Sequence, residues 1–222
     1  MATLLLRLEG PMQSWGITSR FDERDTGLEP SKSGVIGLLC AALGRDRAAS
    51  VDDLAGLRMG VRVDREGIPR REFLTAAGRI MQADGKLKDK VVVSPRYYLS
   101  DASFLVGLEG EDEALLVCLD RALAAPVCPL CLGRKAFTPG RPVRLENGSL
   151  RPGALLEVLR THPLGAQFAP KTARSHPVRF ALESDAEGAL RLDQPTGPFA
   201  QRLFGPRHVL TQVYNVFVQT AS

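Results

Sequence analysis

Residues 101–125 read DASFLVGLEGEDEALLVCLDRALAA. The first eight, Asp101 to Leu108, are mostly apolar and predict a buried strand. From Glu111 to Ala125, three acidic residues open the segment, apolar side chains recur at helical spacing, and Pro126 follows. This pattern is typical of an amphipathic helix. The stretch therefore predicts a strand that leads directly into a helix, as in a mixed α and β domain.

A similar unit stands at the start of the chain. Thr3 to Leu8 is a β-compatible run that ends at Gly10-Pro11, so we expect a strand followed by a loop over Gly10 to Gly16. Residues 33–43 are apolar and rich in small side chains, with Ser31 or Ser33 available as N-cap and Gly44 at the other end. They predict a closely packed helix.

A basic hairpin is predicted between these two units. Arg58 to Val63 alternates apolar and basic residues, which indicates a half-buried strand with a basic outer face. Eight basic residues follow between Arg65 and Arg96, and the turn-forming pair Asp84-Gly85 lies midway between two apolar runs. We expect a protruding basic β-hairpin at about residues 66–100.

The expected order of elements is strand, helix, strand, hairpin, strand and helix, followed by a β-compatible stretch from Leu130 to Val143. This is an α+β fold with an RRM-like, or ferredoxin-like, antiparallel sheet and two helices over residues 1–140. Prolines punctuate the remainder, where a helix at 154–160 and strands at 178–182 and 209–218 are expected. We expect residues 141–222 to form a smaller, loop-rich β module packed on the first.

Composition restricts the class of protein. The chain has 222 residues and a net charge of +4, and 23 of its 29 basic residues are arginines, which favours bidentate binding of phosphate groups. No apolar run approaches the length of about 18 residues that a membrane span needs, and the start does not resemble a secretion signal, so we expect a cytoplasmic protein with no membrane contact. Four cysteines are expected to be free thiols. Cys128 and Cys131 have metal-ligand spacing but lack further ligands, so neither a metal nor another cofactor is expected.

Several segments combine positive charge with side chains suited to RNA. Lys32 and Ser33 stand at the start of a predicted helix, where a phosphate could bind, although a plain capped helix explains them equally well. Trp15, the pair Tyr97-Tyr98 beside Arg96, and Arg134-Lys135 complete a candidate RNA-binding platform. Two alternatives remain open. One is metal-free RNA cleavage by Tyr97, Tyr98 or Lys135 with a histidine from the C-terminal part. The other is a pure protein-interaction module.

Four blocks of sequence resemble the CasD family, a subunit of the type I-E CRISPR-associated Cascade surveillance complex. They occur in the family's order and cover about the first 140 residues, while the tail matches loosely through Phe204 to His208. The blocks are Gly10-Pro-Met-Gln-Ser-Trp-Gly16, Pro30-Ser-Lys-Ser-Gly-Val-Ile-Gly-Leu-Leu39, Tyr98-Leu-Ser-Asp-Ala-Ser-Phe-Leu-Val106 and Leu130-Cys-Leu-Gly-Arg-Lys135.

The resemblance implies a non-catalytic subunit that grips and caps the repeat-derived 5′ handle of CRISPR RNA (crRNA) and anchors the end of the backbone filament. Its implied partners are crRNA, the CasC backbone subunit, the large CasA subunit, other Cascade subunits and, within the complex, target DNA. Carried onto matching positions, the RNA contacts would be Met12, Gln13, Ser14, Trp15, Lys32, Ser33, Arg134 and Lys135. The hairpin, as a thumb toward the neighbouring subunit, would use Arg70, Arg71, Arg79, Lys86, Lys88, Arg96 and Tyr97.

Overall fold

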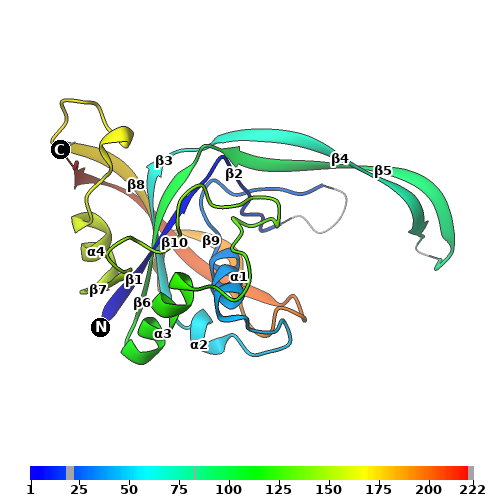
Figure 1. The fold of residues 1–222 in the computed structure, drawn as a ribbon, viewed down its shortest axis with the longest axis horizontal. Helices are drawn as coiled ribbons and strands as arrows, with labels where there is room; N and C mark the ends of the chain where they lie inside the picture. The colour runs from blue at the N-terminus through cyan, green and yellow to red at the C-terminus, as the bar shows by residue number, and fades with distance from the viewer. Residues whose placement is uncertain (19–22, 83, 220–222) are drawn as a thin grey trace.

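The computed structural model describes residues 1–18, 23–82 and 84–219. It consists of a body built on one antiparallel sheet and a long hairpin that curves away from it (Figure 1). The main sheet has seven strands, in the order β7 (Leu150–Pro152), β1 (Ala2–Glu9), β6 (Ser103–Gly110), β3 (Arg58–Arg65), β8 (Ser175–Ser184), β10 (Phe204–Phe217) and β9 (Ala189–Pro195). The predicted mixture of an antiparallel sheet and a few helices is therefore confirmed.

Helices cover both faces of this sheet. On one face, α1 (Lys32–Leu43) and α3 (Glu113–Ala124) bury their apolar side chains against Leu4, Leu6 and Leu8 of β1. On the other face, α4 (Leu155–Thr161) packs on Leu5, Leu105 and Phe180. The short helices α2 (Asp52–Ala55) and η1 (Ala166–Phe168) lie in connections. Leu5 and Leu6 of one strand thus belong to two different hydrophobic clusters, as the alternation of side chains across a strand requires.

The first long helix begins and ends where the sequence indicates. Ser31 is the N-cap, and its hydroxyl accepts a hydrogen bond from the amide of Gly34 at 3.3 Å. Gly44 ends the helix with φ +66°, a left-handed conformation that favours glycine, and its amide donates to the carbonyl of Ala41. Of the two serines proposed as N-cap, the structure selects Ser31.

The stretch from Leu130 to Val143 contains no strand, which corrects the expectation made for it. Pro129, Pro139 and Pro142 cannot donate backbone hydrogen bonds, and Gly133 takes φ +89°, so the chain folds as an irregular loop instead. The edge position beside β1 is taken by β7, which pairs Ala2 with Pro152 and Leu4 with Leu150.

Strand β3 is buried on both faces, so the expected basic outer face is wrong for Arg62. Its guanidinium is fully buried and donates to the carbonyls of Leu159 at 2.8 Å and of His162, and to the carboxylate of Asp64 at 2.6 Å. The reason is that α4 covers the face that the sequence pattern assigns to solvent. Arg62 therefore satisfies the carbonyls at the end of α4 that have no partner within the helix.

The C-terminal strands extend the same sheet. β8 pairs with β3 from Gly60–Leu182 to Val63–Arg179, and β10 and β9 follow outward. Residues 175–217 thus join the sheet of the N-terminal part by backbone hydrogen bonds. The division at residue 140 stays a prediction, but the strands on its two sides share one continuous sheet.

The hairpin is formed by β4 (Ile68–Met81) and β5 (Leu87–Ser100), which pair without a break from Ile68–Ser100 to Met81–Leu87. This confirms the predicted protruding hairpin. The short strand β2 (Met12–Gln13) pairs with Ser100 and Leu99 at its base and makes the three-stranded second sheet. Figure 1 shows the far half of the hairpin extending beyond the body.

Within the described ranges, no helix combines the length and the apolar character needed to span a bilayer.

His162 gives the fold a predicted dependence on pH. Burial and the charges of Arg62, Arg151 and Arg7 lower the pKa of His162 from 6.5 to about 4. Unfolding would restore the ordinary pKa, so the unfolded chain binds more protons between these values. We expect the free energy of unfolding to fall as the pH is lowered from above 6.5 toward 4. Urea unfolding at several pH values should show a smaller fall in His162→Gln than in the wild type. Parallel curves for the two proteins would contradict the expectation.

Candidate nucleic-acid interface

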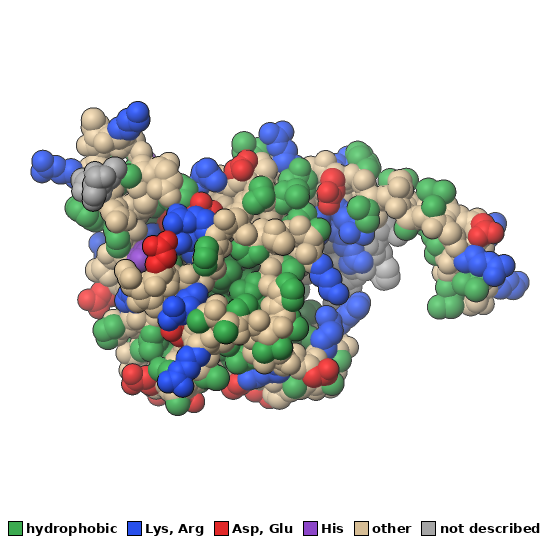
Figure 2. Space-filling view, in the orientation of Figure 1, with side chains coloured by type: hydrophobic (Ala, Val, Ile, Leu, Met, Phe, Trp, Pro, Cys, Tyr) green, Lys and Arg blue, Asp and Glu red, His purple; other side chains and the backbone are tan. Residues whose placement is uncertain are grey.

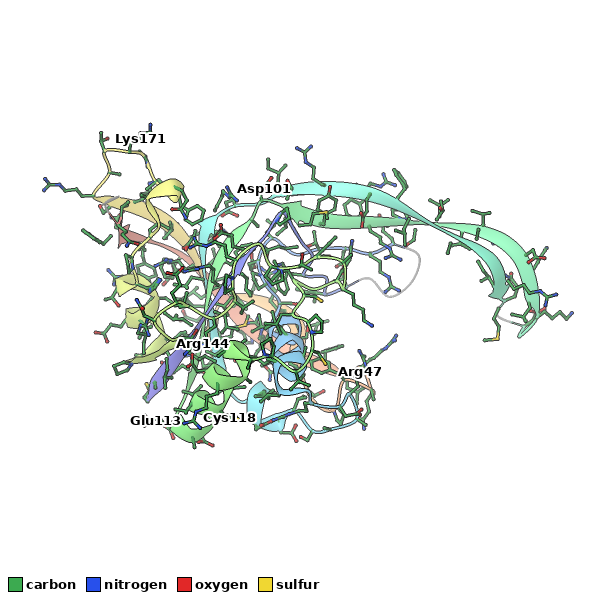
Figure 3. All side chains as sticks on the ribbon, viewed as in Figure 1. Arg47, Asp101, Glu113, Cys118, Arg144 and Lys171 are labelled. Atoms are coloured by element: carbon green, nitrogen blue, oxygen red, sulfur yellow. The ribbon has the colours of Figure 1, made fainter. Side chains whose placement is uncertain are left out.

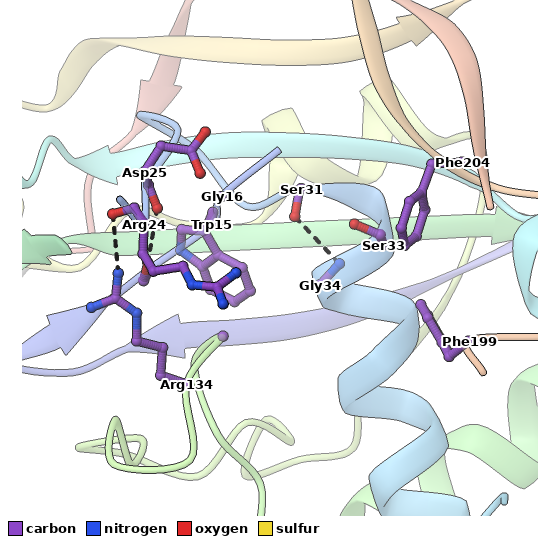
Figure 4. Close-up of a pocket in the computed structure, with 12 residues that line it drawn as sticks. Trp15, Gly16, Arg24, Asp25, Ser31, Ser33, Gly34, Arg134, Phe199 and Phe204 are labelled. Atoms are coloured by element: carbon purple, nitrogen blue, oxygen red, sulfur yellow. Dashed lines mark hydrogen bonds between the residues drawn. The ribbon is translucent and has the colours of Figure 1, made fainter. Parts of the chain in front are cut away.

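A pocket of about 280 Å³ lies between the start of α1 and the base of the hairpin (Figure 4). Four segments distant in sequence line it: residues 14–16, residues 24–25, the first turn of α1, and Gly133-Arg134. Phe199 and Phe204 close the side formed by the C-terminal part. The pocket thus brings together four of the predicted RNA contacts, Ser14, Trp15, Ser33 and Arg134.

The segment from Gln13 to Trp15 forms the floor of the pocket. The Gln13 amide donates to the carbonyls of Leu8 at 3.0 Å and Ala102 at 2.8 Å, and its oxygen accepts from the Trp15 indole at 3.2 Å. Trp15 is only 1% exposed, and Gly34 of α1 lies directly against its ring. In this structure these side chains shape the floor, and the indole presents no open face on which a base could stack. Met12 is half-buried in β2.

A group of arginines carries the charge of the site. Arg134 pairs with Glu72 of β4 at 3.1 Å and donates to the carbonyl of Tyr97 at 2.7 Å. Burial lowers the pKa of Arg134, and the nearby charges of Arg96 and Arg24 lower it further, while Glu72 opposes them. The Nε atom of Arg96 is buried and makes no hydrogen bond within the described part of the chain. Arg24 and Arg96 thus lie near enough to repel the Arg134 guanidinium, and a phosphate among these groups would relieve that repulsion.

Lys32 is not available as the predicted phosphate contact. Its ammonium is buried and pairs with Glu183 at 2.9 Å, and its amide donates to the carboxylate of Asp193 at 2.7 Å. Burial lowers the pKa of Lys32, and Glu183 opposes this effect. The start of α1 is therefore already occupied by a carboxylate from β9, a contact across 161 residues of sequence. Ser33, one residue on, does line the pocket, and Lys135 is exposed on the loop that carries Arg134.

Gly133 allows the Arg134 loop to lie against the floor. A Cβ atom at Gly133 would stand 1.7 Å from the carbonyl oxygen of Ser14, and the residue has φ +89°. Gly148 has a similar φ of +81°, but its nearest neighbour would be 3.6 Å away, at the end of the flexible Arg144 side chain.

We therefore expect Gly133→Ala to lower the free energy of unfolding by about 2–3 kcal/mol and Gly148→Ala by only about 1 kcal/mol, the cost of the left-handed backbone alone. Urea unfolding of both variants measures the difference. Equal losses would show that the loop moves away from Ser14 without cost.

Arg24 and two phenylalanines line the pocket although they are not among the contacts predicted from the sequence. Arg24 precedes a segment that shows neither helical nor strand periodicity in its sequence. In the structure its backbone pairs with the hairpin, because its amide donates to the carbonyl of Pro95 and its carbonyl accepts from the amide of Tyr97. Phe199 and Phe204 lie in the C-terminal part, with ring centroids 6.4 Å apart. Only the loose family match over Phe204 to His208 pointed to that segment.

The predicted thumb residues are spread over the hairpin. Arg70, Arg71, Arg79, Lys86 and Lys88 are exposed, whereas Arg96 and Tyr97 are half-buried at the base. The strand register places five of the hairpin's exposed apolar side chains on one face, and Figure 2 shows apolar side chains along the projection. The five are Phe73, Met81, Leu87, Val91 and Val93. The guanidinium of Arg71 lies over Phe73 and Tyr97, at 4.6 and 5.8 Å from the ring centroids.

The structure does not bring the proposed catalytic groups together at the pocket. Tyr97 and Tyr98 point to opposite faces of β5, and Tyr98 packs against Phe137 with ring centroids 5.9 Å apart. His208 belongs to β10. Of the described residues, those that line the pocket include neither a histidine nor a tyrosine.

The cysteines form no cluster. Cys40 is buried in α1, Cys131 is half-buried, and Cys118 and Cys128 are exposed. In the part of the chain that the structure describes, no group of three or more histidine, cysteine or acidic side chains stands close enough to hold a metal ion.

Comparisons with known proteins agree on one family. The family model described as CRISPR-associated protein (Cas_Cas5) matches residues 3–210. The CRISPR system Cascade subunit CasD of Escherichia coli (strain K12) is 29% identical over 197 residues, which cover 82% of this chain and 87% of that protein.

Two solved structures share the fold along nearly the whole chain. One, described as the crystal structure of a Cas protein, is 47% identical with a TM-score of 0.76 and covers 95% of this chain and 94% of its own. The other, from a CRISPR RNA-guided surveillance complex, is 32% identical with a TM-score of 0.81 and covers 97% of this chain and 91% of its own.

Proposed function

The chain belongs to the Cas5 family of CRISPR-associated proteins, and we propose on that premise that it is a non-catalytic subunit of a Cascade-type, CRISPR RNA-guided surveillance complex. In that complex it binds and caps the repeat-derived 5′ handle of crRNA. The RRM-like plan is part of the proposal. It is supported by the sheet order β7-β1-β6-β3 and by the two long helices, which follow β1 and β6 on one face.

The observation that carries RNA binding is the pair Arg24 and Arg134, which line the pocket, with the charge of Arg96 near Arg134. A phosphate placed among these groups would relieve their repulsion. Phe204, 41% exposed at the pocket margin, offers a ring on which an unpaired base could stack. Single-stranded RNA, with alternating phosphates and bases, fits both features.

The hairpin supports the proposed contact with a neighbouring CasC-type backbone subunit, at the end of the filament. Its exposed apolar side chains, Phe73, Met81, Leu87, Val91 and Val93, would gain stability by burial against protein. Its basic residues would meet RNA or acidic side chains. We also propose that a CasA-type large subunit and, within the complex, target DNA dock on this chain, and the basis for both partners is the family resemblance.

The competing proposal of a metal-free endoribonuclease is tested by incubating the purified chain with a repeat-containing transcript in EDTA. Our proposal predicts an intact transcript that is bound but not cut. Specific cleavage that is lost in Tyr97→Phe, Tyr98→Phe or His208→Gln would overturn the non-catalytic assignment.

A further inference from the structure

A second cavity lies on the opposite face of the main sheet from α1. Its volume is about 330 Å³, and it opens where the face covered by α4 changes from apolar to polar. Along β1 this face carries Leu5, then Arg7, then Glu9. The segment after α4 covers the cavity from above, through His162, Pro163 and Gln167. None of the residues that line it belongs to the arginine pocket described above.

Most charged groups around this cavity already have partners. Asp64 pairs with Arg62 at 2.6 Å, and Arg141 pairs with Glu146 at 3.5 Å. Arg7 and Glu9 are the exceptions, because neither side chain makes a hydrogen bond within the described part of the chain. The Nη1 atom of Arg7 is buried without an acceptor, which is costly unless a ligand supplies one.

The charge balance argues against a simple anion. Two arginines line the cavity, but so do the carboxylates of Glu9, Asp64 and Glu146. His162 adds no positive charge near neutral pH, since burial and neighbouring arginines lower its pKa to about 4. A ligand that suits the cavity must therefore be uncharged where it enters, with acceptors for Arg7 and donors for Glu9.

The hydrogen-bonding groups of guanine complement this arginine and this carboxylate. Arg7 and Glu9 stand two residues apart on one face of β1, so their Cα atoms are about 7 Å apart. Guanine carries adjacent acceptors, O6 and N7, which an arginine binds as a pair. Its N1–H and N2–H donate in parallel, as a carboxylate requires. Unpaired bases in RNA are commonly recognised by hydrogen bonds along these edges.

We propose that this cavity binds one unpaired guanine base, with Arg7 donating to O6 and N7 and Glu9 accepting from N1–H and N2–H. The base could come from a free nucleoside or from RNA. Binding of a guanine within RNA rests on the proposed function, whereas binding of free guanosine does not.

Calorimetric titration of the full chain with guanosine, inosine and adenosine tests the site. We expect the affinity to fall in that order, because inosine lacks the N2 amino group and adenosine presents donors and acceptors in the wrong places. Glu9→Gln is expected to lower guanosine affinity about tenfold or more, the size of one bidentate base contact. Glu157→Gln, on α4 and outside this cavity, should leave it unchanged.

The proposal would be overturned by no binding of guanosine, by equal binding of all three nucleosides, or by unchanged guanosine affinity in Glu9→Gln. Preferential binding of inorganic phosphate that depends on Arg7 would also overturn it, since the cavity would then be an anion site. Thermal unfolding of Glu9→Gln confirms that the variant is folded before its affinity is interpreted.

Short RNAs separate the two sources of the base and keep this test distinct from that of the proposed function. If RNA supplies the base, an RNA with one guanine should bind more tightly than the same RNA with adenine there, and Glu9→Gln should abolish the difference. If only the nucleoside binds, the two RNAs should bind equally while guanosine titration still shows Glu9 dependence. An RNA of uracil and adenine alone should bind Glu9→Gln and wild type equally, because it uses only the arginine pocket.

Discussion

Replacing Arg62 by alanine is expected to lower the free energy of unfolding by about 3–5 kcal/mol, as for other buried ion pairs from which one partner is removed. The guanidinium is buried between β3 and α4 and donates to Asp64 and to the carbonyls of Leu159 and His162. Its removal leaves a buried carboxylate without a counter-charge and frees the end of α4. Urea unfolding followed by circular dichroism measures the loss.

Arg58→Ala is the matched control, because Arg58 lies on the same strand and is exposed. Among the residues that the structure describes, its side chain donates to the carbonyl of Glu183 alone, at 3.2 and 3.3 Å. We expect it to cost about 1 kcal/mol or less. A loss below about 1 kcal/mol in Arg62→Ala would mean that α4 is held by its apolar contacts alone, and the role given to Arg62 would be wrong.

Exchanging both Arg24 and Arg134 for glutamine is expected to weaken binding of single-stranded RNA by a factor of at least about 100 at moderate salt, since each charge-assisted hydrogen bond contributes about 1.5–3 kcal/mol. The plot of log K against log salt concentration should also become shallower by about 1.4, or 0.7 for each phosphate that is no longer neutralised. Filter binding at four or five salt concentrations gives both quantities. Glutamine keeps a hydrogen-bond donor, so the hold of residue 134 on the Tyr97 carbonyl is partly retained.

Arg121→Gln provides the comparison for charge alone, because Arg121 is exposed on α3 and does not line the pocket. It removes the same kind of charge from a different surface of the molecule (Figure 3 labels Glu113 and Cys118, two residues of the same helix). We expect its salt dependence to equal that of the wild type. An equal loss of affinity in Arg121→Gln and in the double variant would mean that RNA responds to net charge and not to the pocket.

Local signals predicted the elements of this fold well. The cap at Ser31, the left-handed Gly44, the acidic start of α3 and the turn of the hairpin all depend on neighbouring residues, and all were found where the sequence placed them. The strand expected at 130–143 failed because its β-compatible side chains are interrupted by prolines and by Gly133, whose backbone lies against Ser14.

Long-range pairing explains what the sequence did not show about the site. Lys32 was predicted to face a phosphate, but its partner Glu183 lies 151 residues away, and nothing local to Lys32 indicates that carboxylate. Arg62 follows a half-buried strand pattern and becomes buried only because α4 returns to cover it. Arg24 gains its position from backbone pairing with the hairpin. Arg134, by contrast, was predicted by its block of sequence and does line the pocket.

Ultraviolet crosslinking of RNA to this chain in the complex purified from cells, followed by mass spectrometry, tests the central claim most directly. The account predicts crosslinked peptides that contain the pocket segments at residues 14–16, 24–25, 133–134 and 199–204, on RNA that retains the repeat-derived 5′ end. A complex that carries its guide RNA while every crosslink to this chain lies outside those segments would contradict it.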